Sequence, residues 1–246
     1  MNQERVQAFL GQALPVRCFS SLDSTNTYAK RWAAQGAPHG ASVFAGAQTQ
    51  GRGRRGRSFF SPEGGLYMSL IVDSAGASPG MFTTLAAVAA VAAVREVAGQ
   101  DLRIKWVNDL IFDGLKVGGI LTEGVVLDGA LKKAVIGIGM NLGAADMPAD
   151  LARIAGSLFV PGQEIDREKL AALIIRGILA GLPLAPAHLD AYRASCLTLG
   201  QVVSFEHENQ PCQGLAMDID DTGALTVQAG SGLVRLIAGD VSIRPA

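Results

Sequence analysis

Two Asp-Gly dipeptides constrain the fold of this chain more than any other feature of its sequence. Asp113-Gly114 and Asp128-Gly129 each stand between two apolar stretches, within residues 110–117 and residues 118–139. An Asp-Gly pair in this setting is a strong signal of a two-residue β-hairpin, because both residues tolerate positive φ. The middle of the chain is therefore expected to form a mostly antiparallel sheet.

Apolar stretches on either side of this region predict further elements of the same domain. Strands are expected at residues 16–19, 41–48, 66–72 and 102–107, and helices at residues 28–34, 81–97, 166–180 and about 186–196. Strands and helices come in blocks and do not alternate strictly. This pattern favours an α+β fold, with a central mixed, mostly antiparallel sheet and flanking helices.

The last part of the chain has a different character. Short strands are expected at residues 202–205, 213–219, 224–228 and 233–238, separated by turn residues. Strands of this length and spacing are typical of a small SH3-like β-barrel appended to a larger domain. We therefore expect two domains, at residues 1–197 and 198–246.

Residues 51–57 carry four arginines and three glycines. Glycine lets the backbone approach a ligand closely, and arginine presents a planar fork of donors that fits phosphate and carboxylate oxygens. Such a loop is suited to close over an anionic ligand. The alternatives are an RNA-contacting segment and a solvated basic loop. A formal net charge of −1 and a pI near 6.3 argue against RNA, because nucleic-acid binding needs a broad positive surface.

The sequence shows no sign of a signal peptide or of a membrane-spanning segment. The cysteines, Cys18, Cys196 and Cys212, are scattered and have no metal-ligand spacing with the histidines. They are expected to be buried thiols of a reducing compartment. The N-terminus lacks the apolar core of a signal peptide, and the longest apolar run, residues 85–94, is too short to span a bilayer. We expect a cytoplasmic protein that contacts no membrane.

Polar and charged residues stand at the ends of apolar stretches in four places. These are Ser24-Thr25-Asn26, the arginine-rich loop 51–57, residues 105–109 and residues 116–120. A single lysine in such a stretch is more simply explained as a strand-edge residue or a snorkelling side chain, and Asn108-Asp109 as a turn. Taken together, two lysines, four arginines and one carboxylate suit chemistry on a phosphate, with Mg²⁺ completing the charge balance.

These segments resemble the bacterial biotin protein ligases, also called biotin–[acetyl-CoA-carboxylase] ligases. The resemblance covers about residues 20–145, and its motifs stand in the family's order. They are LDSTN at residues 22–26, Gln48 with GRGRRGR at 51–57, FSP at 60–62, KWVNDL at 105–110, KVGGIL at 116–121 and GIGMNL at 137–142. The expected C-terminal β-domain also agrees with this family.

The chain departs from many members of that family at two motif positions. Phe59 stands where tryptophan is common and Val107 where proline is common, so we expect altered packing with retained activity. Some relatives also carry an N-terminal DNA-binding helix-turn-helix. Because LDSTN begins at residue 22, no such domain and no DNA partner are expected.

The resemblance implies a ligase that forms an amide (C–N) bond. The family activates biotin with ATP to biotinyl-5′-AMP, and then transfers biotin to a lysine of a biotin carboxyl carrier domain, as in acetyl-CoA carboxylase and similar carboxylases. ATP and biotin would be substrates, with Mg²⁺, and the protein would be a monomer or homodimer. The alternative enzyme is a lipoate-type protein ligase. A nucleotide- or RNA-binding module without chemistry would leave Lys105, Asp109 and Lys116 unexplained.

The resemblance also implies roles for individual residues. Lys116, Arg54 and Asp109 would be catalytic, with Lys116 between the biotin carboxylate and the α-phosphate. Asp109 would serve the acceptor lysine, or alternatively contact Mg²⁺, and Trp106 would belong to the core. Biotin would be bound by Ser24, Thr25, Asn26, Gln48, Gly51, Arg52, Gly53, Arg54, Lys116 and Gly118, and ATP or the adenylate by Arg52, Arg54, Arg55, Arg57, Lys105, Asn108 and Asn141.

Overall fold

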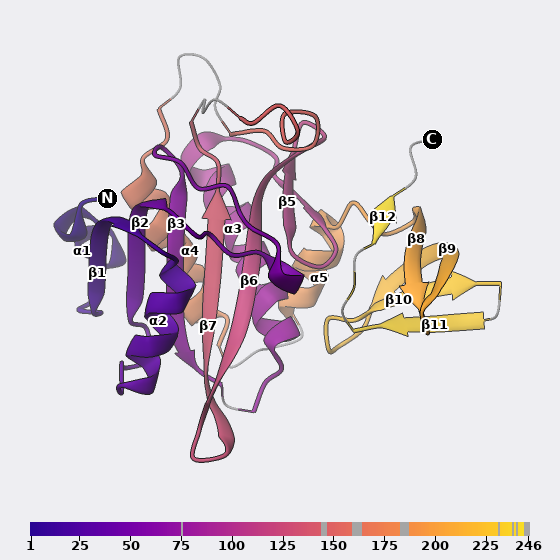
Figure 1. Ribbon diagram of the computed structural model, residues 1–246, viewed down its shortest axis with the longest axis horizontal. Helices are drawn as coiled ribbons and strands as arrows, with labels where there is room; N and C mark the ends of the chain where they lie inside the picture. The colour runs from indigo at the N-terminus through magenta and orange to yellow at the C-terminus, as the bar shows by residue number, and fades with distance from the viewer. Residues whose placement is uncertain are drawn as a thin grey trace.

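A seven-stranded mixed sheet and a five-stranded antiparallel sheet organise the computed structural model of the chain (Figure 1). It describes residues 1–74, 76–143, 147–158, 164–182, 187–230, 232–237, 239 and 241–243. The helices are α1 Gln3–Leu10, α2 Thr25–Ala34, α3 Pro79–Ala98, α4 Arg167–Ala180, α5 Ala187–Ser195 and the 3₁₀ turn η1 Arg54–Gly56. The strands of the large sheet are β1 Val16–Leu22, β2 Ser42–Gln48, β3 Leu66–Asp73, β4 Arg103–Lys105, β5 Asp109–Phe112, β6 Leu115–Leu127 and β7 Ala130–Met140.

Helices cover both faces of the large sheet, whose strand order is β1-β2-β3-β7-β6-β5-β4. β1 pairs with β2 in parallel, and the remaining neighbours are antiparallel. One face packs against α1, α3, α4 and α5, and the other packs against α2 (Figure 1). This arrangement confirms the α+β fold with a mostly antiparallel central sheet.

Helix α3 is the most apolar helix of the fold. Its length and composition would suffice to cross a membrane, but most of its side chains are buried within the protein. Ala86, Ala87 and Ala90 are fully buried, and their small side chains let α3 lie close to the sheet and to α4. The apolar run at residues 85–94 therefore belongs to a core helix, as the sequence indicated.

The two predicted hairpins are confirmed. Asp113 and Gly114 have φ of 49° and 75° between β5 and β6, and Asp128 and Gly129 have φ of 50° and 75° between β6 and β7. Positive φ at both central positions is the requirement of a type I′ turn. The two hairpins place the start of β5, the start of β6 and the end of β7 side by side, where the charged motifs lie.

The strand expected at residues 102–107 is shorter than predicted. β4 ends at Lys105, and the chain turns through residues 106–108 before Asp109 opens β5. At this point the backbone N–H of Trp106 donates to Thr198 Oγ1 at 2.9 Å instead of to a neighbouring strand. A buried donor must find a partner, and here a residue far away in the sequence supplies it.

The small sheet consists of β8 Val202–His207, β9 Gln210–Ile219, β10 Leu225–Ala229, β11 Gly232–Leu236 and β12 Ser242–Ile243, in the order β11-β10-β9-β8-β12. The expected antiparallel strands are present, but they form an open sheet and do not close into a barrel within the described residues. Residues 186 and 238, at the limits of a predicted helix and strand, lie outside the described residues. The domain boundary at 197/198 remains a proposal.

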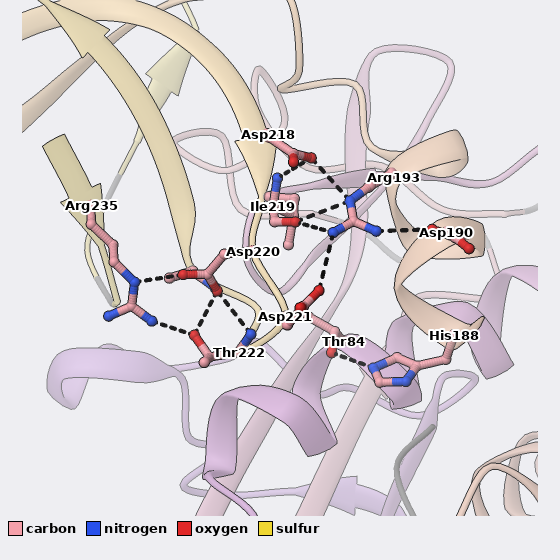
Figure 2. A network of polar contacts seen from close by, with 11 residues as sticks. Thr84, His188, Asp190, Arg193, Asp218, Ile219, Asp220, Asp221, Thr222 and Arg235 are labelled. Atoms are coloured by element: carbon pink, nitrogen blue, oxygen red, sulfur yellow. Dashed lines mark hydrogen bonds and ion pairs between the residues drawn. The ribbon is translucent and has the colours of Figure 1, made fainter. Parts of the chain in front are cut away.

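Arg193 on α5 joins the small sheet to the large domain. Its Nε donates to Asp218 Oδ1 and to the carbonyl of Ile219, each at 3.0 Å, and its Nη1 lies 2.9 Å from Asp190 Oδ1 (Figure 2). The indole N–H of Trp106 adds a bond of 3.1 Å to the carbonyl of Gly223. These contacts fix the small sheet beside the residues that follow β4.

Candidate active site

A cavity of about 250 Å³ lies on the α2 face of the large sheet. Packed interiors hold few voids larger than a water molecule, so this space is a candidate binding site. On β7, Gly137 and Gly139 share this face with Val135, which packs against α2. The two glycines let Asn26 and Phe59 lie directly against the sheet beside the cavity, because a Cβ would come within 2.0 Å of Asn26 at position 137 and within 2.6 Å of Phe59 at position 139.

The cavity is lined by residues from seven segments of the chain. These are Ser24, Thr25 and Asn26; Gln48; Arg52, Gly53, Arg54, Arg57, Ser58 and Phe59; Lys105, Trp106, Asn108 and Asp109; Lys116, Gly119, Ile120 and Leu121; Gly137, Ile138 and Gly139; and Gly239, Val241 and Ser242.

The N-terminus of α2 forms a polar wall of this cavity. Ser24 caps the helix and accepts from Thr27 N. Thr25 donates to Gln48 Oε1 from its backbone N–H at 2.9 Å and from its hydroxyl at 3.3 Å, and Gln48 Nε2 donates to Ser61 Oγ at 2.9 Å. Residues that the sequence separates widely thus form one hydrogen-bonded group.

Asn26 is held on every side by its neighbours. Its Nδ2 donates to the carbonyl of Leu121 at 3.1 Å and to Glu123 Oε2 at 3.0 Å, and its Oδ1 accepts from Ser69 Oγ at 2.6 Å. A Cβ at position 137 would lie 2.0 Å from the same Oδ1, so only glycine allows this approach. Asn26 therefore ties α2 to β3, β6 and β7 beside the cavity.

The arginine-rich loop 51–57 folds back on itself above the cavity. Gly53 N donates to the carbonyl of Arg57 at 2.7 Å, and Arg57 N donates to the carbonyl of Arg54 at 3.1 Å. Gly51 lies so close to the following chain that a Cβ would meet the carbonyl oxygen of Phe59 at 2.3 Å. Glycine at this position is thus required by the backbone packing of the loop itself.

Two arginines of this loop contact different parts of the large sheet. Arg52 reaches β6, and Arg54 reaches the turn before β5. Arg52 forms an ion pair with Glu123, with 3.3 Å between Nη2 and Oε1. Arg54 Nη1 donates to Asn108 Oδ1 at 3.1 Å, and Asn108 Nδ2 donates onward to the carbonyl of Ile120 at 3.0 Å. The loop is therefore attached to the cavity walls through side chains.

Lys116 and Asp109 form an ion pair inside the cavity. The distance between Lys116 Nζ and Asp109 Oδ1 is 2.6 Å, and both side chains are partly exposed. Lys105, at the end of β4, lines the same space. Two lysines and a carboxylate thus face a common volume, as expected for chemistry on an anionic group.

Most of the predicted site residues line this cavity. Ser24, Thr25, Asn26, Gln48, Arg52, Gly53, Arg54, Arg57, Lys105, Asn108, Asp109 and Lys116 do so, whereas Gly51, Arg55, Gly118 and Asn141 lie outside its lining. Asn141 Nδ2 donates to the carbonyl of Gly156 at 2.9 Å. At position 118, a Cβ would lie 2.7 Å from the carbonyl of Gly139, so glycine there serves strand packing.

Several residues in or beside the cavity were not identified from the sequence. Glu123 contacts two cavity residues, although its only sequence signal is that it follows the KVGGIL motif. Val241 and Ser242 close the cavity from the small sheet, and no local pattern marks them. Trp106 is buried, as expected of a core residue, and also lines the cavity.

Sequence comparison identifies relatives along nearly the whole chain. The pattern of the biotin/lipoate A/B protein ligase family matches residues 18–141, and that of the biotin protein ligase C terminal domain matches residues 198–244. The bifunctional ligase/repressor BirA of Bacillus subtilis is 34% identical over 238 residues, 90% of this chain and 72% of that protein. The biotin--[acetyl-CoA-carboxylase] ligase of Paracoccus denitrificans is 30% identical, covering 89% of this chain and 96% of that protein.

Solved structures show the same fold. The biotin protein ligase from Aquifex aeolicus, in complex with biotin and ATP, has a TM-score of 0.82 at 24% identity and covers 94% of this chain and 99% of its own. This structural similarity shows that the two proteins share a fold. The family membership rests on the sequence relatives. The chain therefore belongs to the biotin/lipoate A/B protein ligase family and, within it, to the biotin protein ligases.

Proposed function

We propose that this ligase uses ATP to convert biotin into biotinyl-5′-AMP and then transfers biotin to a lysine of a biotin carboxyl carrier domain. A carboxylate oxygen of biotin attacks the α-phosphorus and pyrophosphate leaves. The acceptor amine then attacks the acyl carbon and AMP leaves. The names of the relatives favour biotin over the lipoate alternative, because they are biotin ligases.

The charge of the cavity is the observation that carries this proposal. Among the described lining residues, five are cationic, Arg52, Arg54, Arg57, Lys105 and Lys116, and one carboxylate, Asp109, faces them. A carboxylate and a triphosphate repel each other in water. Fixed cations lower that repulsion and stabilise the negative charge that builds up on the α-phosphate during attack.

The two ends of the cavity suit the two substrates. The hydroxyl and amide groups of Ser24, Thr25, Asn26 and Gln48 would bind biotin beside the uncharged surface of Ile120, Leu121 and Ile138. Lys116 would stand between the biotin carboxylate and the α-phosphate, and Lys105, Asn108 and the loop arginines would hold phosphate oxygens. In this assignment Arg55 and Asn141, which lie outside the lining, would support the loop and the nucleotide end from a distance.

Asp109 would act in the transfer step. The carboxylate pairs with Lys116 in the cavity, and in this proposal it would accept a proton from the incoming amine as that amine reaches the adenylate. Once Lys116 turns to the substrate carboxylate, Asp109 is freed for this role.

The residues fit Mg²⁺ only as a companion of the triphosphate. The described residues contain no group of three or more His, Cys, Asp or Glu side chains arranged for a metal. Mg²⁺ commonly binds through one carboxylate together with substrate phosphates, and Asp109 would be that carboxylate in its alternative role. When bound, the ion would neutralise phosphate charge.

The family suggests the acceptor, and the cysteines support a compartment. The relatives named for acetyl-CoA carboxylase point to a biotin carboxyl carrier domain as partner. The buried Cys196 and the two partly buried cysteines, none of them disulfide-bonded, accord with a cytoplasmic enzyme.

Pyrophosphate exchange tests the first half of the reaction. The purified protein is incubated with ATP and either biotin or lipoate, and acid-dependent exchange of labelled pyrophosphate into ATP is measured. Exchange with biotin alone, followed by labelling of a purified carboxyl carrier domain, is the expected result. Exchange with lipoate and not with biotin would overturn the proposal.

A further inference from the structure

Glu123 is a carboxylate of β6 that no motif assigns to the site. Its side chain is 16% exposed and contacts two residues that line the cavity, Arg52 and Asn26. Its third partner is Lys30 on α2, which lies outside the cavity lining. Glu123 thus connects the arginine-rich loop 51–57 to the helix that forms the polar wall.

The three contacts of Glu123 differ in length. Lys30 Nζ lies 2.9 Å from Oε1 and Asn26 Nδ2 lies 3.0 Å from Oε2, whereas the guanidinium of Arg52 lies 3.3 Å from Oε1 and 3.4 Å from Oε2. Burial raises the pKa of Glu123, but the bonds from Lys30 and Asn26 and the charge of Arg52 outweigh it and lower the pKa. The group is therefore a stable carboxylate at neutral pH.

These contacts allow Arg52 to leave while the Glu123 carboxylate keeps other partners. A buried carboxylate that loses its only partner is strongly destabilised. When Arg52 leaves, Glu123 keeps Lys30 and Asn26, so the contact to Arg52 can break and re-form easily. When the contact is made, Arg52 is held at the edge of the cavity, 71 residues away in sequence from its partner.

We propose that Glu123 is a positioning residue that holds Arg52 and thereby keeps the arginine-rich loop closed over the cavity. Resting on the proposed function, this contact retains the acyl-adenylate until the acceptor lysine arrives. Glu123 touches neither substrate in this scheme and acts through Arg52.

Proteolysis of the ligand-free protein tests the contact without any assumption about the reaction. Glu123→Gln keeps the shape of the side chain and removes its charge. Trypsin should cut this variant within residues 51–57 roughly fivefold to tenfold faster than wild type. This factor lies between the effect of losing an exposed ion pair and the effect of losing a hydrogen bond to a buried charged group. Asp73→Asn is the matched control, because it removes an ion pair of 2.9 Å to Lys133 in the same sheet, at the end of the β3–β7 pairing that lies away from Gly137 and Gly139 of the cavity.

The rate of adenylate release tests whether the Arg52–Glu123 contact retains the intermediate. Glu123→Gln should form biotinyl-5′-AMP within about twofold of the wild-type rate at saturating substrates and release it roughly fivefold to tenfold faster. Arg52→Ala should release it at least as fast, and adding Glu123→Gln to Arg52→Ala should cause no further change. Lys30→Met should retain the adenylate as wild type does, because it leaves the Arg52 contact intact.

Two results would overturn the inference. The first is equal cutting of the loop in Glu123→Gln and wild type. The second is an effect of Glu123→Gln on release that persists in the Arg52→Ala background, or that Lys30→Met reproduces. If wild type forms no adenylate, the proposed function fails, and the proteolysis comparison alone decides whether Glu123 holds the loop.

Discussion

Lys116 Nζ lies 2.6 Å from Asp109 Oδ1 in the cavity. Lys116 stands opposite Ile111 in the β5–β6 pairing, and Asp109 lies two residues before Ile111, so the two side chains are diagonal neighbours on one sheet face. The lysine proposed to bridge two anions is thus already paired with a carboxylate. Each substrate anion must draw Lys116 away from Asp109, which links the two residues energetically.

Lys116→Ala should slow adenylate formation at least about a hundredfold, the scale of losing one electrostatic donor at a reacting centre. The fold should survive, because the side chain is partly exposed. Pyrophosphate exchange with biotin measures the rate, with Lys133→Ala on β7 as a lysine control outside the cavity lining. Exchange near the wild-type rate in Lys116→Ala would show that its assigned role is wrong.

Asp109→Asn should impair transfer more than adenylation. An attacking lysine must be positioned and must lose a proton, and a carboxylate within hydrogen-bond reach helps with both. The variant also frees Lys116 from its ion pair, so adenylate formation should stay within about tenfold of wild type. Single-turnover transfer from preformed adenylate to a carboxyl carrier domain separates the two steps. Equal loss in both half-reactions would favour the Mg²⁺ role.

Arg54→Gly should release the adenylate roughly tenfold to a hundredfold faster, since losing a hydrogen bond to a charged group costs about 1.5–3 kcal/mol. The substitution also removes the bond to Asn108 that attaches the loop to the cavity wall. Released adenylate reacts with any exposed lysine, so labelling of serum albumin without acceptor is the measurement. Arg153→Gly, on an exposed turn, is the control. Unchanged background labelling with intact adenylate synthesis would exclude a retaining role for Arg54.

Asp220→Asn should destabilise the protein at neutral pH and lose its effect in acid. Burial raises the pKa of Asp220, but bonds from Arg235 and Thr222 outweigh it and lower the pKa from 3.8 to about 2 (Figure 2). The carboxylate therefore contributes stability that is fully present above its ordinary pKa and is lost as the pH falls through about 2. Thermal unfolding of both proteins from pH 7 to pH 2 should show Tm curves that converge in acid. A constant Tm difference would contradict this account.

Local signals in the sequence were enough to predict much of the fold. The Asp-Gly turns depend only on the φ that two adjacent residues tolerate, and Asp113-Gly114 and Asp128-Gly129 form as predicted. Helix α3 follows from the apolar composition of one segment, whereas α2 begins at Thr25, before the residues 28–34 expected from the sequence. The strand expected at 102–107 was too long because a partner from another part of the chain, Thr198, takes the N–H of Trp106.

The sequence by itself also predicted most of the charged residues that line the cavity, since the order of the motifs carries the family resemblance, although Arg55 lies outside the lining and Glu123 was not predicted. Only the tertiary structure decided how they pair. The contacts Lys116–Asp109 and Arg52–Glu123, and the closure of the cavity by Val241, depend on strand register and on how the two sheets sit together. The physical reason is that a turn or a cap is settled by the conformations of a few neighbouring residues, whereas a contact across the sheet is settled by the packing of the whole chain.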